Sequence, residues 1–257
     1  MPQAPGIRSR GASRSWAVAA RAGFTLLLTI PPALALPGQA PPREWTIDTA
    51  QSQLVIHVQP GGLLSPTLHP HHFQPEKWSG EIAWDPLRAK SVKVTVRVAA
   101  DSLRDHQEKL SAKDTAKVEA QTRGPAILDA AQYPEIVFEG HELEIAKTPS
   151  GGKGEFRGTL TGTLTLHGRT MPVGLAIQGL VSADRFQAGA AASFKQSDFG
   201  IKPYSTALGT ISVKDEITLE ISIVAVPADK KPVSKAPSAK PEPNPMPAGT
   251  PESGEHR

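Results

Sequence analysis

Residues 43–226 are dominated by an alternation of apolar and polar side chains with a period of two residues, and no other feature constrains the fold as strongly. Successive side chains of a β-strand point to opposite faces, so this period predicts strands with one buried face. About eight such strands, separated by turn residues, favour a β-sandwich or a β-barrel. The clearest apolar sets are Leu54, Ile56 and Val58; Val92, Val94, Val96 and Val98; Leu160, Leu164 and Leu166; Phe186, Ala188, Ala190, Ala192 and Phe194; and Ile217, Leu219, Ile221 and Ile223.

The two faces of these predicted strands differ in chemistry. One face is mostly Val, Ile, Leu, Ala and Gly, and the other is mostly Thr, Lys, Arg, Glu and Gln. A soluble closed barrel turns its apolar face inward, whereas a membrane barrel turns it to lipid and carries aromatic girdles at both interfaces. Because the whole chain has 7 Phe, 4 Trp and 2 Tyr, too few for such girdles, we expect a soluble barrel.

One segment departs from the alternation. Residues from Asp105 to Arg123 are rich in Ala, Lys, Glu and Gln, contain no Gly or Pro, and are followed by Gly124-Pro125. We expect one amphipathic helix over this range. A short helical turn at 126–130 and a new strand from Tyr133-Pro134 are expected to follow.

Small residues are frequent at the predicted inward positions. They would leave room inside an eight-stranded barrel, and barrels of that size can enclose one small ligand. The alternative is that large neighbouring side chains fill the space, and the composition leaves both options open. The small residues concerned are Ala188, Ala190, Ala192, Gly162, Gly174, Gly179 and Gly189.

The two ends of the chain lie outside the alternating region. Residues 1–35 are typical of a secretory signal peptide, with arginines, an apolar run at 22–30 and a cleavage site after Ala33-Leu34-Ala35. The run is too short for a membrane span and is followed by two prolines, so we expect no transmembrane span in the mature chain. Residues 227–257 contain eight Pro and no apolar period, which predicts a Pro-rich disordered tail.

Charge and composition exclude several functional classes. The formal net charge is +3, but residues 43–226 carry 19 basic and 21 acidic residues. The folding unit therefore lacks the net positive charge that nucleic-acid binding favours. Zero Cys excludes disulfides, thiolate metal sites and Cys nucleophiles. No Gly-x-Ser-x-Gly elbow, phosphate-binding loop or His-Glu-x-x-His helix occurs. We therefore expect no enzyme, and a small hydrolase is the weaker alternative.

A histidine cluster lies between Leu63 and Phe73. His69 and His71 stand two residues apart in an extended segment and would point to one side, where two imidazoles can begin a Zn, Cu or Ni site. The alternatives are hydrogen-bonded or solvated histidines without a metal, or a pH-responsive mouth of the barrel. The spacing does not select the third ligand, for which the candidates are His72, His57, His141, His167 and Asp198.

Seven short motifs follow one another between residues 45 and 226. They are Trp45-Thr46-Ile47-Asp48 with Ser52-Gln53-Leu54-Val55-Ile56; Trp78-Ser79-Gly80-Glu81-Ile82 with Asp85-Pro86; Ala100-Asp101-Ser102-Leu103; Ile127-Leu128-Asp129 with Tyr133-Pro134-Glu135-Ile136-Val137-Phe138; Leu160 to Thr170; Gln196 to Ile201; and Val213 to Ile217. In this order they resemble the YceI-like family of polyisoprenoid-binding proteins. The histidine segment is similar to a Gly-His-Asp-His motif that a subgroup of the family carries at this place.

The resemblance implies an all-β fold: an eight-stranded antiparallel, lipocalin-like barrel with a helix against it. It also implies a periplasmic or secreted protein that holds a polyisoprenoid or another long-chain lipid, has no catalytic residues and needs no cofactor. A transition metal at His69, His71 and His72 is the alternative ligand, and we expect a monomer or homodimer. The predicted lipid-binding residues are Leu54, Ile56, Val58, Phe73, Trp84, Val94, Val96, Phe138, Leu164, Leu175, Phe194, Phe199, Leu219 and Ile221.

Overall fold

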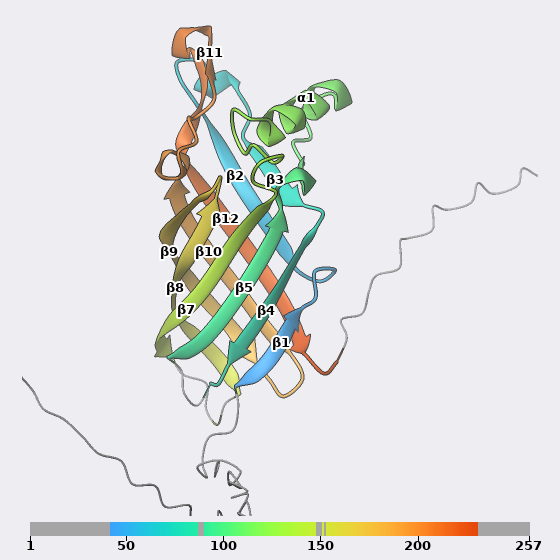
Figure 1. Cartoon of the computed structure of the whole chain (residues 1–257), viewed down its shortest axis with the longest axis vertical. Helices are drawn as coiled ribbons and strands as arrows, with labels where there is room; N and C mark the ends of the chain where they lie inside the picture. Colours follow the sequence, from blue (N-terminus) through green and yellow to red (C-terminus); the bar gives the residue numbers. More distant parts are fainter. Residues whose placement is uncertain (1–41, 87–89, 148–150, 152, 231–257) are drawn as a thin grey trace, which may run out of the picture. The chain divides into compact units, whose positions relative to one another are not determined.

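The computed structural model describes residues 42–86, 90–147, 151 and 153–230 (Figure 1). Within these ranges, twelve strands form one antiparallel sheet that closes into a barrel, and there is one α-helix. The expected all-β barrel with one helix is therefore confirmed. The predicted signal peptide, residues 1–35, and residues 231–257 of the predicted tail lie outside the described residues.

The elements follow the predicted alternation along most of the chain. They are β1 (Arg43–Ile47), β2 (Gln53–Gly61), η1 (Ser65–Thr67), β3 (His71–Pro75), β4 (Trp78–Trp84), β5 (Ser91–Ala99), η2 (Ala100–Ser102), β6 (Leu103–Asp105), α1 (Ala112–Arg123), β7 (Glu135–Lys147), β8 (Gly154–Leu166), β9 (Arg169–Val181), β10 (Phe186–Lys195), η4 (Gln196–Phe199), β11 (Ser205–Thr206), η5 (Ala207–Gly209) and β12 (Ile211–Pro227).

The barrel closes through β12, whose two halves pair with different strands. The sheet runs β1-β4-β5-β7-β8-β9-β10-β12, and the last residues of β12 pair back to β1. The earlier part of β12 pairs with β2 in place of β1. β3 then pairs with β2 in the position that β4 takes beside β1, and β6 pairs with β3 in the position that β5 takes beside β4. The pairs β1 and β2, β4 and β3, and β5 and β6 each share one position, so the described strands form eight positions around the barrel. The ring from β1 to β12 therefore has no free edge, whereas in the described part of the chain β6 pairs only with β3 and β11 only with β12.

The helix is shorter than predicted. It begins at Ala112, seven residues after the predicted start, because the Ser111 side chain caps it by accepting a hydrogen bond from the Asp114 backbone N–H at 3.2 Å. The preceding Asp105 belongs to β6 and pairs with Phe73 of β3, so its backbone is committed to the sheet. The predicted end at Arg123 is correct.

Three other boundaries also differ from the sequence predictions. Residues 71–75, which are not among the strands that the alternation predicts, form β3. Residues 125–128 form a turn and not a helix, with the Gly124 carbonyl accepting from the backbone N–H groups of Ile127 and Asp129. Pro227, the first residue of the predicted tail, is the last residue of β12 and pairs with Trp45.

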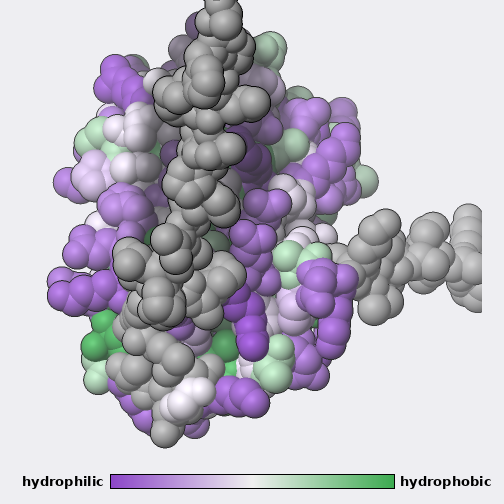
Figure 2. Space-filling model, turned by 60° about the horizontal axis from the view of Figure 1, so that its bottom comes forward, coloured by the Kyte–Doolittle hydropathy of each residue, from purple (hydrophilic) through white to green (hydrophobic). Residues whose placement is uncertain are grey.

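One end of the barrel is filled by aromatic side chains. Trp84 packs edge-on against Phe156 and Phe186, with ring centroids 5.0 and 6.1 Å apart, and Trp45 lies 6.0 Å from Phe186. All four residues are buried. The described residues visible in Figure 2 are mostly hydrophilic. The apolar side of the strands therefore points into the barrel, as the alternation predicts.

Candidate ligand cavity

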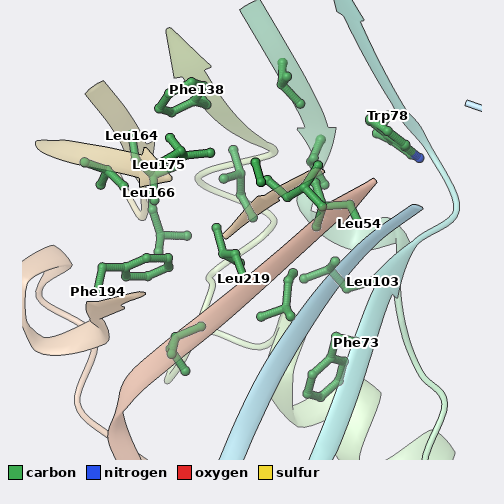
Figure 3. Close-up of a pocket in the computed structure, with 18 of the residues that line it drawn as sticks. Leu54, Phe73, Trp78, Leu103, Phe138, Leu164, Leu166, Leu175, Phe194 and Leu219 are labelled. Atoms are coloured by element: carbon green, nitrogen blue, oxygen red, sulfur yellow. The ribbon is translucent and has the colours of Figure 1, made fainter. Parts of the chain in front are cut away.

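The barrel encloses a cavity of about 330 Å³. Its walls come from the inward faces of the barrel strands, and side chains such as Phe138 of β7 and Leu219 of β12 extend into it (Figure 3). Trp84 and Phe156 bound it at the aromatic end, while Val118 of α1 contributes at the other. Ligand pockets of this size and apolar character are typical of small-molecule sites.

The structure brings thirteen of the fourteen predicted lipid-binding residues together around this cavity. Phe199 is the exception: it is completely buried, but its ring packs behind Phe194 with centroids 5.3 Å apart. The residues that line the cavity are Leu54, Ile56, Val58, Phe73, Trp84, Val94, Val96, Phe138, Leu164, Leu175, Phe194, Leu219 and Ile221. Their contact with a lipid remains a proposal.

Sequence reasoning missed the contribution of the helix and of the turn after it. Their side chains carry no period of two, and α1 has no fully buried residue that would mark its inner face. In these two segments the lining residues that the prediction lacked are Val118, Gln121, Thr122, Ile127 and Leu128. The helical spacing of Val118 and Gln121 was the available signal, but spacing does not show which end of a barrel a helix covers.

The small residues contribute to the cavity less than predicted. Ala188 and Ala190 line it. Gly162 and Gly179 face inward, but the rings of Phe138 and Phe156 cover them, since a Cβ at either glycine would lie 2.7 Å from the ring. Gly174 and Gly189 alternate with inward residues and face outward. For the two inward glycines, the alternative that large neighbours fill the space is therefore correct.

Few polar groups line the cavity. Among the described residues, those lining the cavity include no Lys, Arg, Asp or Glu. The Gln196 amide is already used, because it donates a hydrogen bond to the Lys214 carbonyl at 2.8 Å. The polar side chains that remain are His71 of β3, Gln121 and Thr122 of α1, and Tyr204 before β11.

His71 forms a close pair with Asp105. The His71 Nδ1 atom lies 2.6 Å from Asp105 Oδ2, and the Asp105 side chain has no exposed surface. The other carboxylate oxygen, Oδ1, accepts hydrogen bonds from the backbone N–H groups of His72 and Gln107 at 3.3 and 3.2 Å. A buried carboxylate needs such donors to offset its lost hydration.

The predicted metal ligands do not converge. His71 and His72 are neighbours in a strand, so their side chains lie on opposite faces, His71 toward the cavity and His72 outward. On the outer face His72 meets His57, with their Nδ1 atoms 2.8 Å apart, and His57 Nε2 lies 3.4 Å from Glu220. His69 is exposed before β3. No group of three or more candidate ligands occurs among the described residues.

A carboxylate on β12 holds η4 beside the cavity. The Ser197 hydroxyl donates to Asp215 Oδ2 at 2.6 Å and the Ser197 backbone N–H donates to Oδ1 at 2.9 Å. The pKa of Asp215 lies below its ordinary value, mainly because of the hydrogen bond from the Ser197 hydroxyl. The Ser197 backbone N–H and the charge of Lys195 lower this pKa further. A lowered pKa in the folded state stabilises the fold above about pH 4, and this contribution is lost as the pH falls through the folded pKa.

Ser197→Ala should therefore raise the pKa of Asp215 toward its ordinary value, because the strongest donor is gone. NMR titration of the side-chain carboxyl carbons would measure this shift. Asp184 provides the control, since Ser182 and not Ser197 lowers its pKa. An unchanged Asp215 titration in the variant would contradict the assignment of the Ser197 hydroxyl as the main cause.

No helix in the described part of the chain is long and apolar enough to cross a membrane.

Comparisons with known proteins agree on one fold. The model of the YceI-like domain matches residues 45–225. The crystal structure of BcnA from Burkholderia cenocepacia aligns with a TM-score of 0.53 at 21% identity, over 70% of this chain and 99% of that chain. A polyisoprenoid binding domain from Saccharophagus degradans, implicated in plant cell wall breakdown, aligns with a TM-score of 0.51 at 12% identity, over 71% and 98%. No curated protein matches the chain.

Proposed function

The chain belongs to the YceI-like domain family, and from that membership we propose that it binds a long-chain lipid of the polyisoprenoid class inside its barrel. The membership also confirms the resemblance seen in the ordered motifs. The observation that carries the proposal is the cavity of about 330 Å³ inside the barrel, whose lining is almost entirely apolar. The name of the polyisoprenoid binding domain from Saccharophagus degradans supports the same ligand class.

The physical driving force is the transfer of an apolar chain from water into the barrel. Each buried CH2 group contributes ~0.8 kcal/mol, so about ten carbons give roughly 8 kcal/mol before costs. A gross contribution of roughly 8 kcal/mol corresponds to a Kd of about 1 μM, and ordering the flexible chain opposes binding, so the net Kd for ten carbons is above about 1 μM. The aromatic cluster around Trp84 fills one end, so the polar end of the ligand would lie toward α1, where the polar lining residues are found.

We infer that the protein acts by binding, as a carrier or sensor in the periplasm or outside the cell. The signal-like sequence at residues 1–35 supports export, and a monomer or homodimer would suffice because one barrel contains the whole cavity. Metal binding has less support, since His71 and His72 lie on opposite faces of β3 and His69 is exposed before it. A hydrolase also has less support, because the cavity lining that the structure describes contains no serine.

Native mass spectrometry of the full chain, isolated from its own cell envelope, tests the proposal. We expect additional mass that is released on denaturation and partitions into organic solvent. The same protein, stripped of lipid, should then take up a fluorescent prenyl-chain probe. A folded barrel with neither bound apolar mass nor uptake of the probe would rule the proposed function out.

A further inference from the structure

We propose that His71 anchors the polar head of the bound lipid and that this head is an uncharged hydroxyl, as in a long-chain prenyl alcohol. This inference rests on the proposed function and adds the head-group chemistry of the ligand. It starts from the juxtaposition of one buried carboxylate, one cavity-lining imidazole and an otherwise uncharged wall.

The contacts of Asp105 decide which nitrogen of His71 is free. Asp105 is fully buried and accepts hydrogen bonds from two backbone N–H groups, as suits an ionised carboxylate. Its remaining oxygen lies 2.6 Å from His71 Nδ1, so this nitrogen carries the proton of the imidazole and donates a hydrogen bond to the carboxylate. The Nε2 atom of His71 is thereby left as the group that can accept a hydrogen bond from a ligand.

The surroundings hold the imidazole in one orientation. The rings of His71 and Phe73 stack at an interplanar angle of 27° with centroids 6.0 Å apart. The segment before His71 is held as well, because the Gln107 side chain donates to the Pro70 carbonyl. The Asp105 backbone N–H donates to Glu119 at 3.1 Å, which ties β6 to α1. A ligand therefore meets a preorganised acceptor, and preorganisation reduces the entropic cost of binding.

The described cavity lining has no cationic side chain of Lys or Arg, which disfavours an acidic head group. Among the described residues that line the cavity, none is Lys or Arg, and the charge of a protonated His71 would already be balanced by Asp105. A carboxylate or phosphate head would add an uncompensated negative charge to an apolar interior, which is costly. A hydroxyl head adds no charge and can donate its proton to Nε2, and Gln121, Thr122 and Tyr204 offer further hydrogen bonds.

The test compares a prenyl alcohol, the matched hydrocarbon and the matched carboxylic acid, each by competition with the fluorescent prenyl probe. His71→Leu should weaken binding of the alcohol by about tenfold, because a buried hydroxyl loses its partner, and should change binding of the hydrocarbon by less than about twofold. His72→Leu is the matched control, since this neighbour faces outward and should leave both affinities unchanged. The double variant His71→Leu/Asp105→Asn removes the buried charge in case the single variant does not fold.

The outcomes separate the anchor from the proposed function. If the wild-type barrel binds neither the hydrocarbon nor the alcohol, the proposed function fails and the anchor fails with it. If it binds the hydrocarbon but both His71 variants keep the wild-type ratio of alcohol to hydrocarbon affinity, only the anchor is wrong. Tighter binding of the acid than of the alcohol would overturn the assignment of an uncharged head.

Discussion

Ala190→Trp should abolish uptake of a long-chain probe while leaving the barrel folded. Ala190 lies in β10 between Ile177 of β9 and Ile221 of β12, and its side chain lines the cavity. An indole ring at this position would enter a space of about 330 Å³ and displace the ligand chain from it. Excluding even three carbons, at ~0.8 kcal/mol per CH2, weakens binding by more than tenfold.

The adjacent variant Ala191→Trp is the matched control. Ala191 is exposed on the outer face of the same strand, so a tryptophan there leaves the cavity open. Uptake is followed by probe fluorescence and the fold by circular dichroism and urea unfolding. We expect a modest loss of stability for Ala190→Trp, because the ring fills existing space. Uptake by the Ala190 variant equal to that of the wild type would show that the cavity does not hold the lipid chain.

Gly179→Ala should lower the free energy of unfolding by about 3 kcal/mol, the upper end for overpacking a core. A Cβ at this position would lie 2.7 Å from Cζ of Phe156 and would also approach the Gln187 carbonyl oxygen. Phe156 cannot easily move, because its ring packs against Trp84 and Phe186 at the closed end of the barrel. The methyl group would therefore disturb the aromatic cluster and the pairing of β9 with β10.

Gly174→Ala provides the comparison within the same strand. Gly174 is exposed, and the nearest atom to a Cβ there is Thr159 Cγ2, at 3.8 Å. This variant should be neutral or slightly stabilising, because alanine restricts the unfolded chain without a clash in the folded one. Equal urea midpoints for the two variants would show that the aromatic cluster tolerates a side chain at position 179.

Most of the barrel could be predicted because its signal is local. The alternation identified the inward face of each long strand, and thirteen of the fourteen predicted residues line the cavity. Phe199 was misplaced because it lies in η4, where the period of two no longer applies. The short strands β3 and β6 were missed because three to five residues, rich in His, Pro and Asp, carry too little alternation.

For the glycines and histidines, the local sequence did not predict which distant residues they contact. The sequence identifies Gly162 and Gly179 as small, but only the packed barrel places the rings of Phe138 and Phe156 over them. The sequence predicted that His69 and His71 point to one side of an extended segment, and it left the place of His72 open. In β3 the pleat separates His71 from His72 and pairs each with a residue distant in sequence.

The sequence by itself determined the fold class, the family and the inward side of the strands, because alternation and motifs are properties of neighbouring residues. Only the tertiary structure decided which groups meet at the cavity: Asp105 approaches His71 across 34 residues of sequence, and α1 contributes Val118, Gln121 and Thr122 to the lining. The physical reason is that strand register and barrel closure are long-range. A shift by one residue would exchange every inward side chain for an outward one without altering the local pattern.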